Sequence, residues 1–127
     1  MVNLEQLLIE NPVIAAIRND KDLEKVILSK ALIVFVLYGS IMDIKKICEK
    51  LKEAGKVVFI HVDLIEGLKG DYAGLLFIKQ CEEPYGIIST RPTNIRNGKK
   101  LGLCVIQRIF VLEDRKSTRL NSSHRLY

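Results

Sequence analysis

The sequence predicts an α/β fold, a partial (β/α) barrel of about five parallel strands with intervening helices. Five short apolar runs rich in Val, Ile, Leu and Phe are typical of strands buried on both faces. Helical patterns lie between them, and this alternation indicates βαβ units with right-handed crossovers. The chain shows neither a GxGxxG fingerprint nor a P-loop, which disfavours a nucleotide-binding open sheet. The five runs are residues 13–17, 32–37, 57–62, 86–89 and 103–107.

The first two helices between strands are predicted from their capping residues. Asp20 is expected to cap the first of them, with Leu23 and Val26 on its buried side. Ser40 is expected to cap the second, with Asp43 three residues later as the other half of a capping-box-like pair. The second helix then carries an apolar stripe at helical spacing and ends at a glycine. The stripe and the glycine are Ile41, Ile44, Ile47, Cys48, Leu51 and Gly55.

The remaining two helices follow the third and fourth strands. Residues 72–81 form the third predicted helix. Pro92 suits the first position of a fourth, short helix, because a proline there loses no hydrogen bond, and this helix is expected to end near Gly102.

Composition favours a single domain inside the cell. The chain has 127 residues and 48% apolar content, enough for one sizeable core. No apolar run approaches the roughly 18 residues of a membrane span, and the N-terminus has no signal-peptide pattern, so no membrane partner is expected. Three widely spaced cysteines, Cys48, Cys81 and Cys104, suggest reduced thiols and a cytoplasmic protein.

The C-terminal segment, residues 114–127, differs from the rest of the chain. Codons for residues 114–124 can be written so that they resemble a sequencing-library adapter read in frame, so we interpret 114–127 as an adapter-derived, non-native, disordered tail. The alternative is a genuine disordered polar tail. The segment holds four basic residues and one acidic residue, so residues 1–113 carry only +2 of the net charge of +5. Residues 1–113 are then the N-terminal part of a barrel that is expected to continue beyond Glu113.

Polar side chains follow every predicted strand, and this pattern predicts a ligand site. In α/β folds the carboxyl ends of the strands form the ligand face. Alternation along the third strand places His61 and Asp63 on the same side as Phe59, facing the barrel interior. Arginines bind phosphate bidentately, so a small polyol phosphate fits this face. The candidate ligand-binding residues are Arg18, His61, Asp63, Lys69, Thr90, Arg91, Gln107 and Arg108. The pattern does not decide whether Gln107 or Arg108 faces the interior.

Each candidate has a plainer structural interpretation. His61 could be a hydrogen-bonded core histidine, and with Asp63 it supplies only two visible metal ligands, too few for a recognisable metal site. Glu66 and Lys69, three residues apart, could form a solvated pair, and Arg108 could pair with a structural acid.

The stretch RPTNIRNGKK is a second candidate site. Its four basic residues, Arg91, Arg96, Lys99 and Lys100, have no acid among them and could contact an RNA backbone. A solvated basic helix face is an equal alternative, because no aromatic residue between Gly86 and Ile109 offers a stacking platform for bases.

Four motifs in order, AAIRN, FIHVDLIEGLKGD, GIISTRP and VIQRIFVLE, closely resemble the glycerol-3-phosphate-responsive antiterminator family, which regulates glycerol uptake operons. The resemblance covers about residues 12–113 and includes all eight candidate ligand-binding positions. It implies a TIM-barrel-like fold, no enzymatic activity and no cofactor, with glycerol 3-phosphate as effector. The implied partner is the leader mRNA of glycerol operons, where binding prevents premature transcription termination.

The chain departs from this family by its length, because family members continue through further βα units. Phosphate sites of barrels often lie in late loops, so the chain as written is not expected to close its barrel or bind effector normally. Two other hypotheses remain open. One is a barrel enzyme acting on a polyol or sugar phosphate, with His61 as general acid/base oriented by Asp63. The other is a fragment without activity.

Overall fold

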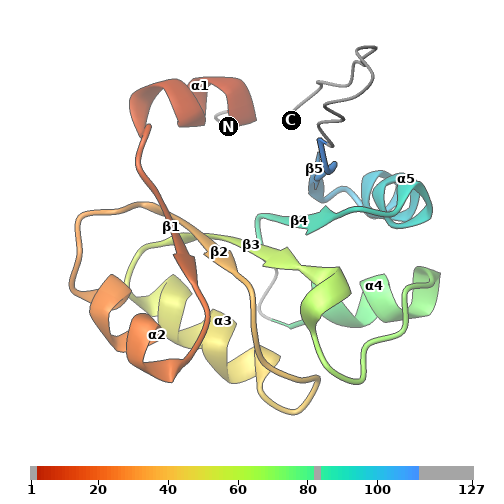
Figure 1. The fold of residues 1–127 in the computed structure, drawn as a ribbon, viewed down its shortest axis with the longest axis horizontal. Helices are drawn as coiled ribbons and strands as arrows, with labels where there is room; N and C mark the ends of the chain where they lie inside the picture. The colour runs from red at the N-terminus through yellow and green to blue at the C-terminus, as the bar shows by residue number, and fades with distance from the viewer. Residues whose placement is uncertain (1–2, 82–83, 112–127) are drawn as a thin grey trace, which may run out of the picture.

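The computed structural model describes residues 3–81 and 84–111, which form alternating strands and helices (Figure 1). The predicted tail, 114–127, lies outside the described residues. The strands are β1 (Ile14–Ile17), β2 (Ile33–Val36), β3 (Val57–His61), β4 (Gly86–Ser89) and β5 (Cys104–Gln107). The helices are α1 (Leu4–Glu10), α2 (Asp20–Ile27), α3 (Ile44–Glu53), α4 (Tyr72–Lys79) and α5 (Pro92–Lys100), with a 3-10 turn, η1 (Val62–Leu64).

The five strands form one parallel sheet in the order β1-β2-β3-β4-β5. Strands that follow one another along the chain are therefore neighbours in the sheet, and β1 and β5 are the outermost strands among the described residues. Helices α2 to α5 flank one side of the sheet, while α1 lies beyond its other side (Figure 1). This arrangement confirms the predicted α/β class and the five parallel strands, and each strand agrees with its predicted apolar run to within one residue at either end.

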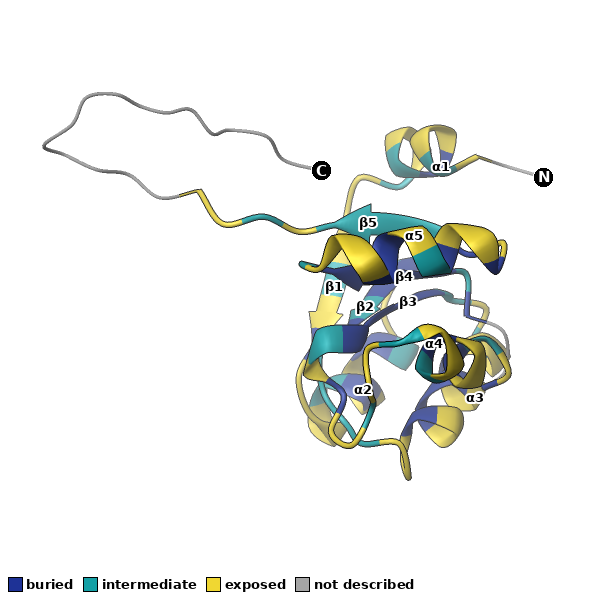
Figure 2. Ribbon diagram, turned by 90° about the vertical axis from the view of Figure 1, so that its right-hand side faces the viewer, coloured by how far each residue is buried: buried dark blue, intermediate teal, exposed yellow. Residues whose placement is uncertain are grey.

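Two apolar cores lie on opposite faces of the sheet. Val58, Ile60 and Val62 belong to the larger core, which the flanking helices cover. Phe59 belongs to the smaller inner core. The central strands β2, β3 and β4 are largely buried, whereas β1 and β5 are more exposed (Figure 2). Burial on both faces explains why the central strands are continuous apolar runs rather than alternating ones.

The first helix, α1, was not predicted. Its Leu7 packs into the inner core with Ile33, Phe59 and Ile88. The Asn3 side chain caps it by accepting from the Gln6 backbone N–H at 2.7 Å. A short helix with one buried residue has too weak a periodicity to stand out, because its stability comes from tertiary packing.

Two predicted helix caps were wrong by one to three residues. Asn19, and not Asp20, caps α2, because its side chain accepts from the Asp22 backbone N–H at 2.8 Å. Helix α3 begins at Ile44, so Ser40 lies in the turn before it. The predicted pairing of Ser40 with Asp43 is nevertheless formed, since Asp43 accepts from the Ser40 N–H at 3.2 Å and from its hydroxyl at 3.1 Å.

The last two helices follow the prediction more closely. Helix α4 ends at Lys79, two residues before the predicted end. Pro92 opens α5 as predicted. The chain turns at Gly102 with φ +80°, a value that L side chains rarely adopt. No helix among residues 3–81 and 84–111 is long and apolar enough to cross a membrane.

Helix α5 lies very close to the sheet at Gly98. A Cβ at this position would come within 2.8 Å of Ile87 Cδ1 and Val105 Cγ1. We expect Gly98→Ala to lower the free energy of unfolding by about 1 kcal/mol, because overpacking of up to ~3 kcal/mol outweighs the ~1 kcal/mol gain in helix propensity. Urea denaturation of the wild type and of Gly98→Ala measures this difference in the free energy of unfolding. In an Ile87→Val background, which removes the crowding Cδ1, the cost should shrink; an unchanged cost would contradict this packing.

Candidate functional site

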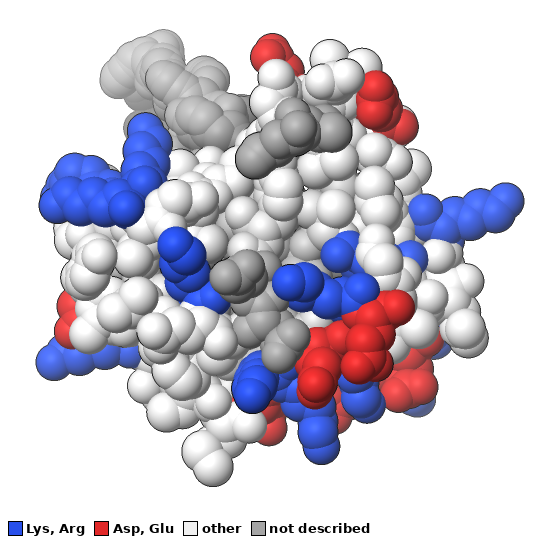
Figure 3. Space-filling view, turned by 180° about the vertical axis from the view of Figure 1, so that it is seen from behind, with Lys and Arg blue, Asp and Glu red and all other residues white. Residues whose placement is uncertain are grey.

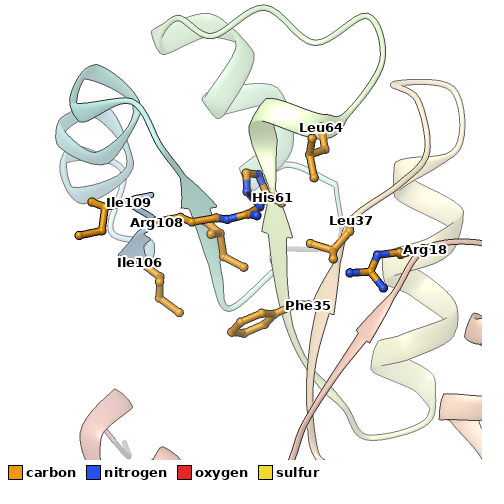
Figure 4. A pocket seen from close by; sticks show the side chains of 9 residues that line it. Arg18, Phe35, Leu37, His61, Leu64, Ile106, Arg108 and Ile109 are labelled. Atoms are coloured by element: carbon orange, nitrogen blue, oxygen red, sulfur yellow. Dashed lines mark hydrogen bonds between the residues drawn. The ribbon is translucent and has the colours of Figure 1, made fainter. Parts of the chain in front are cut away.

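A cavity of about 520 Å³ opens on the inner side of the sheet, at the carboxyl ends of its strands (Figure 4). Arg18 follows β1 and Arg108 follows β5, so the two edge strands each supply a guanidinium. Apolar side chains such as Phe35, Leu37 and Ile106 supply much of the rest of the wall. No carboxylate belongs to the described residues that line it, so the cavity is positively charged.

Backbone contacts at the start of α2 fix the position of Arg18. The Arg18 N–H donates to the Asp22 carboxylate at 2.9 Å, and Asn19 caps the helix that follows. The chain therefore turns sharply from β1 into α2, and Arg18 stands at the carboxyl end of the strand. In the close view its guanidinium lies across the cavity from Arg108 (Figure 4).

The structure places Arg108, and not Gln107, at the cavity. Along β5, Val105 packs against the helix-side core, whereas Cys104 and Ile106 pack against the inner core. Alternation therefore places Gln107 on the helix side and Arg108 on the inner side. A backbone hydrogen bond of 2.9 Å from the Arg108 N–H to the Ser89 carbonyl keeps this register beyond the end of the strand.

His61 ends β3 with its ring buried at 2% exposure. Its Nε2 lies 3.1 Å from Arg108 Nη1. A guanidinium can only donate, so Nε2 accepts and the proton of the neutral ring is on Nδ1. That Nδ1 is buried and has no hydrogen-bond partner among the described residues. Burial lowers the pKa of His61 and so does Arg108, while Asp63 raises it, and the net effect keeps the ring neutral at pH 7.

Asp63 lies outside the cavity, contrary to the alternation argument. The strand ends at His61, and the 3-10 turn η1 breaks the period-two pattern, turning Asp63 toward β4. Its carboxylate accepts from the Ser89 hydroxyl, the Thr90 backbone N–H and the Thr90 hydroxyl, each at 2.7 Å. Asn94 Nδ2 adds a longer bond of 3.3 Å. Asp63 thus joins the end of β3 to the start of α5.

The hydrogen bonds of Asp63 explain its pKa. Burial alone would raise the pKa of this carboxyl, but the bonds from Thr90 and Ser89 stabilise the charged form and hold the pKa below its usual value. Since these groups occupy both carboxylate oxygens, Asp63 does not orient His61 as the enzyme hypothesis required. Among the described residues, no group of three or more His, Cys, Asp or Glu side chains could hold a metal ion.

The other predicted ligand residues are not at this cavity. Lys69 lines a separate surface cavity of about 300 Å³ beside α4. Thr90 is engaged with Asp63. Arg91 is exposed at the start of α5, where its N–H donates to the Ser89 hydroxyl at 3.0 Å. The structure therefore brings together Arg18, His61 and Arg108, and it leaves Lys69, Thr90, Arg91 and Gln107 outside this group.

Three residues around the site were missed in the sequence. Ser89 and Asn94 are almost fully buried and bond each other at 3.1 Å, which completes the Asp63 network. The Phe110 ring lies 5.3 Å from the Arg108 guanidinium carbon, a cation–π distance. The available signal for Ser89 was a polar residue at the end of an apolar run. We found no sequence signal for Phe110.

A second, more polar cavity of about 660 Å³ lies between α2 and α3 and shares Arg18 with the first. It carries both signs of charge, including Asp20, Asp43 and Lys46. The Tyr38 hydroxyl donates to the Asp20 carboxylate at 2.8 Å, and burial together with Asp20 raises the pKa of Tyr38. Mixed charge makes this cavity a poorer anion site than the first.

The basic candidates for RNA binding lie along α5. Arg91, Arg96, Lys99 and Lys100 are all exposed there. Seen from behind, Lys and Arg side chains are spread over the surface rather than joined in one patch, and acidic side chains gather at lower right (Figure 3). The structure therefore shows exposed cations along α5.

Comparisons with known proteins agree with this fold. Residues 13–125 match the family model described as glycerol-3-phosphate responsive antiterminator. The chain is 40% identical over 110 residues to the uncharacterized protein YgcP of Escherichia coli K12, covering 87% of this chain and 58% of that protein.

Two solved structures are also similar. One is the glycerol uptake operon antiterminator regulatory protein of Listeria monocytogenes, with a TM-score of 0.76 and 33% identity over 81% of this chain and 56% of that one. The other is a glycerol uptake operon antiterminator-related protein of Thermotoga maritima, with a TM-score of 0.72 and 30% identity over 80% and 57%. The chain thus spans somewhat more than half the length of these relatives. It belongs to the glycerol-3-phosphate responsive antiterminator family.

Proposed function

We propose that this protein is a cytoplasmic, mRNA-binding transcription antiterminator without enzymatic activity. Glycerol 3-phosphate would bind at the strand ends and raise its affinity for the leader mRNA of glycerol uptake and metabolism genes. Membership of the family supports responsiveness to this effector. The observation that carries the proposal is the cavity in which two arginines face one another without a carboxylate among the described lining residues.

The chemistry of the cavity suits a small phosphorylated polyol. Guanidiniums bind phosphate through paired N–H donors, and the apolar wall around Phe35 and Ile106 can pack against a carbon backbone. A volume of about 520 Å³ is within the range of small-molecule sites. Five other residues remain proposed as ligand-binding residues, although they do not line this cavity. They are Asp63, Lys69, Thr90, Arg91 and Gln107.

The RNA would contact the exposed face of α5, with Arg91, Arg96, Lys99 and Lys100 against phosphates. Asp63 supports a coupling between effector and RNA, because it sits two residues after His61 and bonds Thr90 and Asn94 at the start of α5. If effector binding shifted the carboxyl end of β3, these hydrogen bonds would transmit the movement to α5.

The test is the affinity of the full-length protein for a glycerol-operon leader RNA with and without glycerol 3-phosphate, measured by fluorescence anisotropy at fixed salt. We expect the effector to tighten binding by between about 5-fold and 150-fold, the usual range of coupling between sites. Lys99→Gln with Lys100→Gln should weaken RNA binding and its salt dependence, whereas Lys45→Gln with Lys46→Gln, on α3, is the charge-matched control. Equal RNA affinity with and without effector would refute the proposal.

A further inference from the structure

We propose that His61 is a positioning residue of an anion subsite: its neutral ring holds the Arg108 guanidinium toward Arg18, so that two guanidiniums bind one dianion. This inference rests on the proposed function and adds how the cavity would take the phosphate of its effector. It gives His61 a role other than direct contact with the ligand. It also makes anion binding depend on the protonation state of a buried ring.

The Arg108 side chain is held on two sides. His61 Nε2 accepts from its Nη1 at 3.1 Å, and the Phe110 ring lies 5.3 Å from its guanidinium carbon. To reach His61 the side chain crosses over β4, since β4 separates β3 from β5 in the sheet. A guanidinium has five N–H donors, so the bond to His61 leaves donors free to face the cavity. A long side chain fixed in this way loses less entropy when it binds a ligand.

Arg18 supplies the second cation from the opposite edge of the sheet (Figure 4). Two guanidiniums directed at one apolar-walled cavity repel each other, and an anion between them relieves that repulsion. The described lining residues include no acid that could do this internally.

The surroundings of His61 favour a neutral ring whose Nε2 accepts a hydrogen bond from Arg108, rather than a charged ring. The ring is 2% exposed, and Nδ1 is buried without a partner among the described residues. The charged groups that face it are Arg108 at Nε2, Arg18 in the wall of the same cavity, and Asp63 two residues along the chain. A proton on His61 Nε2 would turn this hydrogen-bond acceptor into a donor. It would also add a third positive charge to those of Arg18 and Arg108. The Arg108 guanidinium would then lose its contact with His61.

The two roles of His61 predict opposite pH profiles. If His61 positions Arg108, anion affinity falls as pH is lowered through the titration of the ring. If His61 binds the anion directly as a cation, affinity rises instead. Sulfate is the right probe, because it stays doubly charged across this range, whereas the second ionisation of a phosphate group near pH 6 would blur the result.

The experiment measures sulfate affinity of the chain between pH 5 and pH 8 by calorimetry, at constant ionic strength. We expect wild-type affinity to fall as the ring becomes protonated, by about tenfold at full protonation, the value of one charge-assisted hydrogen bond. His61→Gln keeps an acceptor that cannot titrate, so it should bind well at both pH values. His61→Phe should bind about tenfold more weakly at pH 8, and Lys45→Gln should match wild type.

Several results would overturn the inference. These are a wild-type affinity that rises toward pH 5, no sulfate binding at all, or His61→Phe and His61→Gln profiles that match wild type. Nitrogen-15 NMR of the ring gives a readout independent of ligand: the neutral ring should carry its proton on Nδ1, and a proton on Nε2 would overturn the geometry. Effector-independent RNA binding would refute the proposed function alone and leave this sulfate profile standing.

Discussion

Replacing Asp63 with alanine is expected to lower the free energy of unfolding by about 3 kcal/mol, among the largest effects of any single substitution in this protein. The substitution removes the acceptor for the Ser89 hydroxyl and for two donors of Thr90. Ser89 is fully buried and is left without its carboxylate partner. Chemical denaturation followed by circular dichroism measures the change.

The same carboxylate gives the protein a defined acid sensitivity. The pKa of Asp63 is lowered in the folded state, so its contribution is complete above the unfolded pKa of about 4 and is lost as pH falls through the folded value. Asp63→Asn should remove most of this dependence, whereas Glu66→Gln, an exposed neighbour, should not. A stability of Asp63→Ala within 0.5 kcal/mol of wild type, on the scale of ordinary surface changes, would show that the network is dispensable.

Removing both cavity arginines is expected to weaken glycerol 3-phosphate binding by about a hundredfold. Arg18→Gln and Arg108→Gln should each cost about tenfold, as expected for loss of one charge-assisted contact. Arg18→Lys should recover only part of the affinity, because a lysine lacks the planar fork. Isothermal titration calorimetry measures all of these.

Two further variants identify an alternative phosphate site. Lys69→Gln and Arg91→Gln remove the predicted cations that lie outside the cavity. If these weaken effector binding and the cavity variants do not, the phosphate binds in the loops before α4 and α5 and the cavity assignment is wrong. Lys45→Gln again controls for loss of one positive charge.

The central strands could be predicted from the sequence because they are buried on both faces. Residues such as Val34, Val58 and Ile87 are fully buried, so a continuous apolar run reports the element whatever its neighbours do. The rule that strand ends carry function also pointed to Arg18, His61 and Arg108, which the structure places around one cavity. Their role in ligand binding stays a prediction.

The sequence could not predict side-chain directions at the point where a strand or helix ends. The alternation of β3, if continued, would place Asp63 on the inner side of the sheet. Instead η1 begins immediately after His61 and turns the Asp63 side chain toward β4. The choice between Gln107 and Arg108 required the register of β5, which is set by pairing with β4. Asn19 and Asp20 are both good caps, and only the backbone geometry at Asn19, with φ −164°, separates them.

The origin of the two cavity arginines has a consequence for local unfolding. Arg18 and Arg108 flank β1 and β5, two strands that share no backbone hydrogen bond in the described sheet. Local opening of either strand would dismantle the cavity while the central strands stayed intact. A bound anion would therefore link β1 to β5 and slow amide hydrogen exchange in both strands together.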